Sequence, residues 1–343
     1  MSESIYVGLD LGSSRCQQTV LSADGEFRFS RVIPTGEQSL RKAFAKLGND
    51  VRVHLEAGEL SDWAHSVIKP LVASVTVSHP RDLAWIAKDA NKTDAVDARK
   101  LAELLRINRV HPVYCQTDQR RRTFKQLVAH YEQMSRDQAR LKSKIKARLR
   151  TLGVIRKDAR LFTPEGQSAL LAELAADQSV KQMFVQSFAV LNQMLAAQTQ
   201  AKAAMTAAAE QFPEVALLQT APGVGIITAC RFVAYIQAPR RFSNKRKLWR
   251  YARLGITRRE SNGKRLAHPR LDSSGIGSLK DCSRKVFEAA RRTKCDNSFK
   301  RAFEQSLANT KNAVHARLST QRKILAVLRA MWLKMQPFRD TDS

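Results

Sequence analysis

The sequence has few acidic residues, few cysteines and no long apolar segment. Its 343 residues contain 31 Asp and Glu against 59 Lys and Arg, a net charge of +28. No run of about 18 apolar residues occurs, which argues against a membrane-spanning helix. The first residues also lack the basic and apolar regions of a signal peptide. We therefore expect a cytoplasmic protein without membrane association.

The five cysteines are too few and too widely spaced for a disulfide framework or a zinc site. None forms a C-x-x-C pair, whereas zinc-binding and disulfide-rich domains place cysteines at short, regular spacings. The seven histidines are scattered and show no metal-ligand spacing. His54, two residues before Glu56, is therefore expected to be a packed or supporting residue and not a metal ligand.

The positive charge lies in the later part of the chain. Residues 1–90 contain 10 basic and 11 acidic side chains, whereas residues 91–343 contain 49 basic and 20 acidic ones. A neutral first domain followed by a strongly cationic body predicts a polyanionic partner, above all a nucleic acid. Because 43% of the residues are hydrophobic, the chain can also bury a core, which excludes wholesale disorder.

The first hundred residues alternate between strand and helix patterns. Strand patterns occur at 5–10, 17–21, 26–33, 51–56 and 73–78, and helical spacing occurs at 36–47, at 61–71 and between 82 and 106. The Asp24-Gly25 dipeptide indicates a hairpin between the second and third strands. The order βββαβαβα predicts an α/β domain with a mixed sheet of the ribonuclease H type, in which the first strand lies beside the fourth.

Acidic residues end two of these strands and begin the last helix. Asp10 and Glu56 each end an apolar strand, and neighbouring parallel strands present such ends at one edge of a sheet. Asp94 and Asp97 lie on one face of the first turn of a helix, where two like charges destabilise the helix unless a cation lies between them. Each acid alone is more often a solvated structural residue. Four carboxylates around one point suit Mg²⁺ and two-metal phosphodiester chemistry.

Two long amphipathic helices are expected in the middle of the chain. Apolar residues recur at helical spacing from Thr117 to Leu152 and from Val180 to Phe212, and the two patterns can pair as an antiparallel coiled coil. Thr163 followed by Pro164 indicates the start of a short helix between them. We divide the chain into an α/β domain over 1–116, a helical coiled-coil region over 117–212 and a mostly helical C-terminal domain over 213–343.

A glycine turn and a basic segment mark the C-terminal region. The turn over residues 221–225 resembles a helix-hairpin-helix, in which glycines let the backbone approach a phosphate; an ordinary turn between packed helices is the equal alternative. Residues 240–270 contain twelve basic side chains, one acid and the aromatics Phe242, Trp249 and Tyr251, which can stack on bases or anchor the segment to the core. The expected nucleic-acid contacts are Gly223, Gly225, Arg240, Arg241, Lys245, Arg246, Lys247, Arg250, Arg258, Arg259, Lys264 and Arg265.

Several segments, in this order, resemble the DEDD transposases of the IS110 family of insertion sequences. The matching segments are Gly8-Leu9-Asp10, Leu55-Glu56-Ala57, Lys92-Thr93-Asp94-Ala95-Val96-Asp97-Ala98-Arg99, Ala221-Pro222-Gly223-Val224-Gly225 and Gly255-Ile256-Thr257-Arg258-Arg259-Glu260-Ser261. The family includes the Piv-type invertases. Its members are recombinases with a RuvC-like domain, a coiled coil and a C-terminal transposase domain, and many are directed by a bridge RNA. The sequence departs from the usual pattern at residues 58–63, where many relatives carry Thr-Gly and an aromatic.

The resemblance implies a set of site residues and partners. It implies that Asp10, Glu56, Asp94 and Asp97 bind Mg²⁺ and that Ser261 is the nucleophile of a phosphoserine DNA intermediate. Composition alone would not suggest Ser261, because residues 260–263 also fit a polar turn. The implied partners are donor and target double-stranded DNA, a bridge RNA and further copies of the chain, with dimers pairing into a tetramer and an active site that can be completed between subunits.

Three other functions are compatible with parts of the sequence. A RuvC-type Mg²⁺-dependent nuclease would use the same acids to activate water and would not need Ser261. A non-enzymatic nucleic-acid-binding protein fits the charge, although four converging acids would repel a polyanion in the absence of metal. Residues 8–14 also resemble the first phosphate loop of actin-like ATPases and sugar kinases, but those proteins need a glycine-rich adenosine segment downstream.

Overall fold

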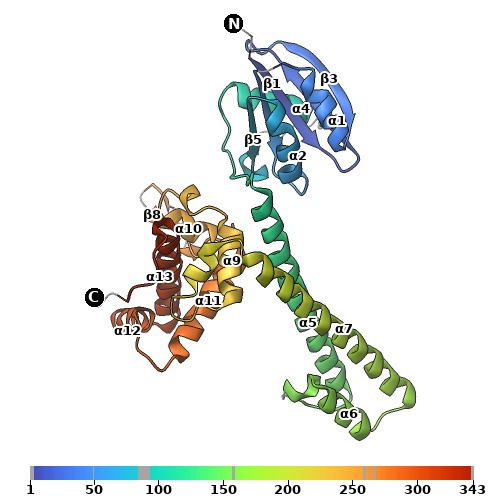
Figure 1. Ribbon diagram of the computed structural model, residues 1–343, viewed down its shortest axis with the longest axis vertical. Helices are drawn as coiled ribbons and strands as arrows, with labels where there is room; N and C mark the ends of the chain where they lie inside the picture. The colour runs from blue at the N-terminus through green and yellow to red at the C-terminus, as the bar shows by residue number, and fades with distance from the viewer. Residues whose placement is uncertain are drawn as a thin grey trace. The chain divides into compact units, whose positions relative to one another are not determined.

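The structure, a computed structural model, describes residues 4–48, 50–83, 93–156, 159–257, 260–262, 264–265 and 268–340. The chain forms two compact units, Met1–Asp118 and Gln119–Ser343 (Figure 1). In the described part of the chain, no helix has both the length and the apolar character needed to cross a bilayer.

The first unit is built on a five-stranded mixed sheet. Its strands are β1 (Ile5–Leu11), β2 (Arg15–Leu21), β3 (Phe27–Pro34), β4 (Val51–Glu56) and β5 (Ser74–Ser78). They lie in the order β3-β2-β1-β4-β5; β2 is antiparallel to both of its neighbours, and β4 is parallel to both of its own. The predicted pairing of the first strand with the fourth is confirmed. This mixed α/β arrangement is compatible with a ribonuclease H-like domain.

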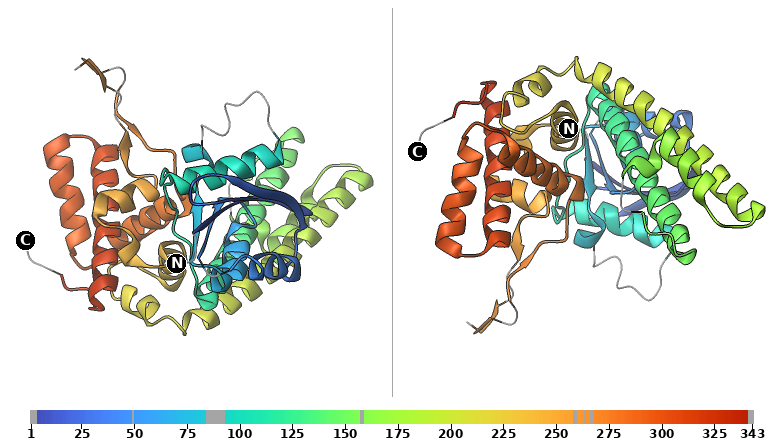
Figure 2. Two further views of the ribbon diagram at one scale, coloured as in Figure 1. Left: turned by 90° about the horizontal axis from the view of Figure 1, so that it is seen from above. Right: turned by 90° about the horizontal axis from the view of Figure 1, so that it is seen from below.

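Helices cover both faces of this sheet. They are α1 (Glu37–Ala45), α2 (Ser61–Ile68) and α4 (Asp94–Arg106), with 3-10 turns η1 (Lys69–Leu71) and η2 (Pro80–Leu83). α1 and α2 lie on one face, and α4 crosses the other over β1, β2 and β4 (Figure 2). Because side chains alternate along a strand, Val7 and Leu9 of β1 enter the core beneath α1 and α2, whereas Gly8 faces α4.

Gly8 determines how closely α4 approaches the sheet. A Cβ atom at this position would lie 1.8 Å from the Ala98 carbonyl oxygen and 2.7 Å from the Ala102 backbone nitrogen. Ala98 and Ala102 are themselves fully buried. Close contact between the helix and β1 therefore depends on the absence of a side chain at residue 8.

His54 lies on β4, the strand next to β1, and connects α4 to the sheet by a hydrogen bond. Its Nδ1 lies 2.8 Å from the Leu101 carbonyl oxygen, and its Nε2 lies 2.9 Å from Ser78 Oγ. Burial lowers the pKa of His54, which favours the neutral ring. Both ring nitrogens are thus occupied by hydrogen bonds within the unit, in agreement with the expectation that His54 is a packed or supporting residue.

The second unit begins with two long helices, as the apolar spacing predicted. α5 (Gln119–Thr151) and α7 (Gln178–Ala209) lie side by side (Figure 1). Gln138 donates to the Met194 carbonyl oxygen at 2.9 Å, and Gln198 donates to Ser135 Oγ at 2.7 Å, so the helices run antiparallel.

A short helical segment connects the two long helices. It consists of η3 (Ala159–Phe162) and α6 (Pro164–Glu173). The predicted cap is confirmed, because the Thr163 hydroxyl accepts the Gly166 N–H at 3.2 Å. Leu170 of α6 packs with Phe184 of α7 and Ile145 of α5 in a separate small core.

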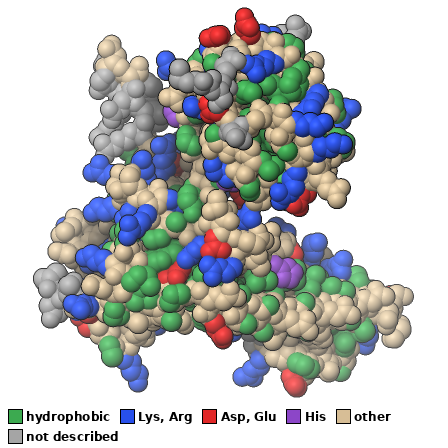
Figure 3. All heavy atoms as spheres, turned by 45° about the horizontal axis from the view of Figure 1, so that its top comes forward, with side chains coloured by type: hydrophobic (Ala, Val, Ile, Leu, Met, Phe, Trp, Pro, Cys, Tyr) green, Lys and Arg blue, Asp and Glu red, His purple; other side chains and the backbone are tan. Residues whose placement is uncertain are grey.

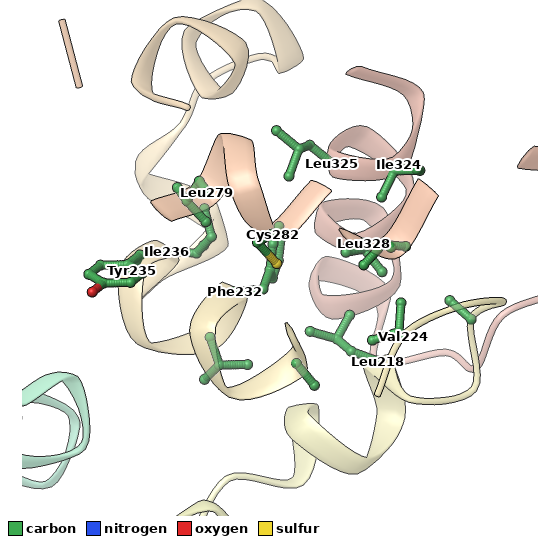
Figure 4. Close-up of a cluster of buried hydrophobic side chains, with 14 of the residues drawn as sticks. Leu218, Val224, Phe232, Tyr235, Ile236, Leu279, Cys282, Ile324, Leu325 and Leu328 are labelled. Carbon is green, nitrogen blue, oxygen red and sulfur yellow. The ribbon is translucent and has the colours of Figure 1, made fainter. Parts of the chain in front are cut away.

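The rest of the second unit is mostly helical. Its elements are α8 (Pro213–Leu218), α9 (Ile226–Ile236), η4 (Pro239–Arg241), α10 (Lys245–Tyr251), β6 (Ile256–Thr257), β7 (Glu260–Ser261), β8 (Lys264–Arg265), β9 (Arg270–Leu271), α11 (Gly277–Arg292), α12 (Ser298–Thr310) and α13 (Ala313–Lys334). Figure 4 shows its core, in which Phe232 of α9, Cys282 of α11 and Leu328 of α13 meet.

A buried polar cluster joins α5 to this helical core. The Glu132 carboxylate accepts hydrogen bonds from Arg231 Nε, from the Tyr235 hydroxyl at 2.6 Å and from Ser278 Oγ at 2.8 Å. Arg231 also donates to Asp281 at 2.9 Å. Burial, together with the Glu132 carboxylate, raises the pKa of Tyr235. Since these residues come from α5, α9 and α11, the cluster fixes the position of α5 relative to the core.

Candidate functional site

Asp10 and Glu56 are neighbours on the sheet face that α4 covers. The parallel register of β1 and β4 pairs Gly8 with His54, so Asp10 and Glu56 follow two residues later as the next pair on the same face. Glu56 is exposed and Asp10 is half-buried. Both residues line a pocket of about 420 Å³ at the carboxyl ends of their strands.

The first turn of α4 lies at the same edge of the sheet. It contains Asp94 and Asp97 and is capped by Thr93. At the other end of the helix, Arg106 Nη1 donates to the Ala23 carbonyl oxygen at 3.4 Å, and Ala23 lies in the turn between β2 and β3. That turn is at the amino end of β1, so α4 runs antiparallel to β1 and starts near the carboxyl end of this strand.

Gln17 of β2 lies between the two pairs of acids. It is the register partner of Asp10, and it lines a second pocket, of about 340 Å³, together with Asp94 and Cys16. Burial is the main cause of the raised pKa of Cys16, and the charge of Asp10 adds to it. Asp10, Glu56 and the start of α4 therefore gather at one edge and on one face of the sheet.

The four acids do not form a closed metal cage. Among the residues that the structure describes, no group of three or more Asp, Glu, His or Cys side chains has the arrangement needed to hold an ion. The donor chemistry nevertheless fits a hard divalent cation, since all four side chains offer carboxylate oxygens. Asp94 and Asp97 also have a structural benefit, because negative charge in the first turn of a helix is stabilised by about 0.3–1 kcal/mol.

Ser261 lies on a small hairpin of the second unit. It pairs with Lys264 across β7 and β8, and Asn262 in the turn has a φ of 50°, which Asn tolerates better than most residues. Ser261 is exposed, and the hairpin extends away from the helices of its unit (Figure 2). The hydroxyl is therefore accessible to a large substrate. Arg258 and Arg259, which were expected to contact nucleic acid, lie outside the described residues.

The two glycines of the predicted turn have different environments. Gly223 has a φ of 76°, and a Cβ there would lie 2.5 Å from both the Ala290 nitrogen and the Val286 carbonyl oxygen of α11. Gly225 is exposed and is the N-cap residue of α9, with open space where a Cβ would lie. Gly223 therefore serves helix packing, as in the ordinary-turn alternative, whereas Gly225 remains at the surface.

The basic residues expected to contact nucleic acid differ in their surroundings. The exposed group is Arg240, Lys245, Arg246, Lys247 and Arg250. Arg241 instead packs over the rings of Phe242 and Tyr251, 4.8 and 4.5 Å from their centroids. Lys264 and Arg265 form β8, and their side chains lie outside the described part of the structure. Lys and Arg side chains are spread widely over the face drawn in Figure 3.

The aromatic residues of this segment serve as anchors. Phe242 is buried and packs against Tyr251 at a centroid distance of 5.3 Å. The Trp249 indole donates to the Arg322 carbonyl oxygen at 2.9 Å. Of the two roles that the sequence allowed for these rings, the structure supports attachment to the core.

The chain matches two sequence patterns of one transposase family. The pattern of the DEDD transposases of the IS110 type matches residues 7–153, which include all four acids. The transposase pattern of the IS116/IS110/IS902 family matches residues 215–301, which include the glycine turn, the basic segment and Ser261. The chain belongs to the IS110 family of transposases. It is therefore a DNA-acting transposase or recombinase. No curated protein matches it.

The structure adds residues to this transposase that the sequence did not suggest. Glu59 lines the same pocket as Asp10 and Glu56. Arg322 of α13 reaches the basic segment, where its Nε donates to the Leu254 carbonyl oxygen at 2.8 Å. No local signal in α13 distinguishes Arg322 from other helical arginines, because its partner lies 68 residues earlier in the chain.

Proposed function

We propose that this IS110-family transposase cleaves and exchanges DNA strands through a phosphoserine bond at Ser261, with Asp10, Glu56, Asp94 and Asp97 as Mg²⁺ ligands. The observation that carries the proposal is the convergence of two strand ends and one helix start, all acidic, at one edge of a single sheet. The DEDD transposase match supports it.

The proposed ligands act as two pairs. Asp10 and Glu56 are held by the β1–β4 register, and Asp94 and Asp97 are held by the contact of α4 with Gly8. A bound Mg²⁺ would neutralise charge on the phosphate and favour ionisation of an attacking hydroxyl. Because these acids are attached to a rigid sheet and a tightly packed helix, they can hold that charge in a fixed position.

Ser261 would act as the nucleophile. A bond forms between its Oγ and phosphorus while the bond from phosphorus to the displaced strand oxygen breaks; the serine proton is released and the displaced oxygen takes up a proton. The phosphodiester is exchanged and not hydrolysed, so the reverse attack by a DNA hydroxyl reseals a strand without ATP. The exposed position of Ser261 on its hairpin is compatible with access to a duplex.

The proposal includes partners and architecture. Donor and target double-stranded DNA would bind the exposed arginines and lysines of the basic segment over residues 240–270, and a bridge RNA would direct the choice of site. The antiparallel helices α5 and α7 would form the coiled-coil region over 117–212, between a RuvC-like domain over 1–116 and a C-terminal domain over 213–343 that contains a helix-hairpin-helix-like turn. Two dimers would form a tetramer, with active sites completed between subunits.

Replacement of Ser261 by alanine separates this proposal from the alternatives. We expect Ser261→Ala to lose Mg²⁺-dependent recombination and the covalent protein–DNA product, whereas Ser319→Ala, which changes an exposed serine of α13, retains both. Retained Mg²⁺-dependent cutting by Ser261→Ala would indicate a RuvC-type nuclease. DNA binding that is indifferent to Mg²⁺, together with no cleavage, would indicate a non-enzymatic binding protein.

A further inference from the structure

An arginine-lined pocket lies at the base of the hairpin that presents Ser261. It has a volume of about 710 Å³, and its lining includes Arg246, Trp249, Arg250, Ile256, Thr257 and Arg322. The charged residues of this lining are all arginines. An anionic ligand is therefore favoured over a neutral or cationic one.

Arg322 is positioned in the pocket without a carboxylate partner. Its Nε donates to the Leu254 carbonyl oxygen at 2.8 Å, and the described part of the chain provides no carboxylate within ion-pair distance of its guanidinium. Burial lowers the pKa of Arg322. A half-buried guanidinium is costly when no anion compensates for its lost hydration, and a phosphate in the pocket would supply that anion.

Arg250 is oriented by an ion pair and is still accessible. Its Nε donates to Asp272 Oδ2 at 2.7 Å, while its side chain is 71% exposed. Asp272 is buried, and its other oxygen accepts the Ser274 N–H at 2.8 Å. Arg246 lies one helical turn before Arg250 on the same face of α10 and is also exposed. Two arginines of α10 and one of α13 thus surround one volume.

We propose that this pocket binds the phosphate backbone of the nucleic-acid strand next to the Ser261 hairpin, through Arg246, Arg250 and Arg322. Binding of a strand in the pocket is argued from the arginines alone; only the link to the reaction at Ser261 rests on the proposed function. Thr257 in the pocket wall and Ser261 are four residues apart, a span of at most about 14 Å. At about 3.4 Å per nucleotide, this span corresponds to about four nucleotides, so the pocket and Ser261 can contact nearby positions of one strand.

Binding measurements can test this pocket independently of the reaction. In a Ser261→Ala background, which prevents covalent capture, dissociation constants are measured by fluorescence anisotropy for labelled duplex DNA, single-stranded DNA and RNA over a series of salt concentrations. We expect Arg246→Ala to weaken binding and to reduce the slope of log K against log salt by about 0.7–0.9, the value for one phosphate contact. Arg322→Lys, which keeps the charge but changes the geometry, is expected to weaken binding as well.

Arg292→Ala is the matched control, because it removes one exposed arginine at the end of α11, outside the pocket. A slope that falls for one kind of oligonucleotide and not for the others supports the pocket and identifies its strand as DNA or RNA. Equal slopes for Arg246→Ala and Arg292→Ala with all three oligonucleotides would overturn the inference.

The inference and the proposed function can fail separately. If the protein with Ser261 intact forms a DNA adduct while Arg246→Ala leaves the salt slope unchanged, the pocket assignment alone is wrong. If Arg246→Ala reduces the slope but no adduct forms, the pocket assignment stands and the role of Ser261 is wrong.

Discussion

Replacement of Gly8 by alanine is expected to displace α4 and, with it, Asp94 and Asp97. The new Cβ would lie 1.8 Å from the Ala98 carbonyl oxygen, whereas non-bonded carbon and oxygen atoms rarely approach within about 3.0 Å. The helix must therefore move by more than about 1 Å. Overpacking of this kind costs about 1–3 kcal/mol of folding free energy, and a shift of about 1 Å in a catalytic group can reduce a rate by about 100-fold.

The assay combines thermal unfolding with Mg²⁺-dependent DNA strand cleavage. Gly36→Ala is the control, since Gly36 has an extended backbone with a φ of −171° and its Cβ would meet Ser39 Oγ at an ordinary 3.9 Å. We expect Gly8→Ala to remain folded with a lower melting temperature and a strongly reduced cleavage rate, and Gly36→Ala to resemble the unchanged protein. A Gly8→Ala protein that cleaves at the normal rate would refute the view that α4 positions its acids through this contact.

Three further predictions concern the buried polar groups and the metal. Glu132→Ala leaves Arg231 buried without a main partner and should lower the free energy of unfolding by about 3–5 kcal/mol in urea titrations. Asp137→Ala removes a half-buried acid of the same helix whose ion-pair partner, Arg140, is exposed, and should change this free energy by no more than about 1 kcal/mol. Equal effects of the two substitutions would contradict the role of the cluster. Burial lowers the pKa of His54 below 6.5 in the folded protein. Its neutral ring therefore contributes to the free energy of unfolding above pH 6.5, and this contribution should be lost as the pH falls through the lower folded-state pKa. A His54→Gln protein whose stability has the same pH dependence would exclude His54 as the cause. Removal of divalent ions with a chelator should abolish cleavage while DNA binding continues, since the basic side chains provide the affinity; full cleavage in chelator would exclude a metal requirement.

The first unit was largely predictable from local sequence patterns. Each strand showed a short β-branched or apolar run, and the acid at the end of β4 falls at the predicted residue, Glu56. The pairing of β1 with β4 followed from the order of the elements, because βαβ units favour parallel neighbours. The adjacency of Asp10 and Glu56 could therefore be inferred from the sequence alone.

Contacts between distant segments could not be predicted in the same way. The sequence left open whether Gly223 faces a phosphate or belongs to an ordinary turn between packed helices. The place that a Cβ atom would take at Gly223 is occupied by the backbone of α11, which lies more than 60 residues later. Arg241 appeared as one of several surface cations, yet two aromatic rings hold it in place. The interaction of Glu132 with Arg231 spans 99 residues. Such pairings depend on how helices pack together, and helical spacing alone does not specify a partner.

Ser261 marks the limit of reasoning from residue patterns. Its hairpin contains a turn residue at positive φ and short strands, features that fit a polar turn as well as a reactive loop. Its expected role came from the resemblance to a transposase family and not from spacing or charge. The four acids, in contrast, were indicated by their positions at strand ends and at a helix start, independently of that resemblance.

Mass spectrometry of the protein after reaction with DNA tests the central claim most directly. The protein is incubated with its DNA substrates, a guide RNA and Mg²⁺, the DNA is digested with nuclease, and the peptides are analysed for a nucleotide adduct. We predict an adduct on Ser261 that requires Mg²⁺ and is absent from an Asp10→Asn protein. An adduct on a different residue, or strand cleavage with no adduct at all, would contradict the account.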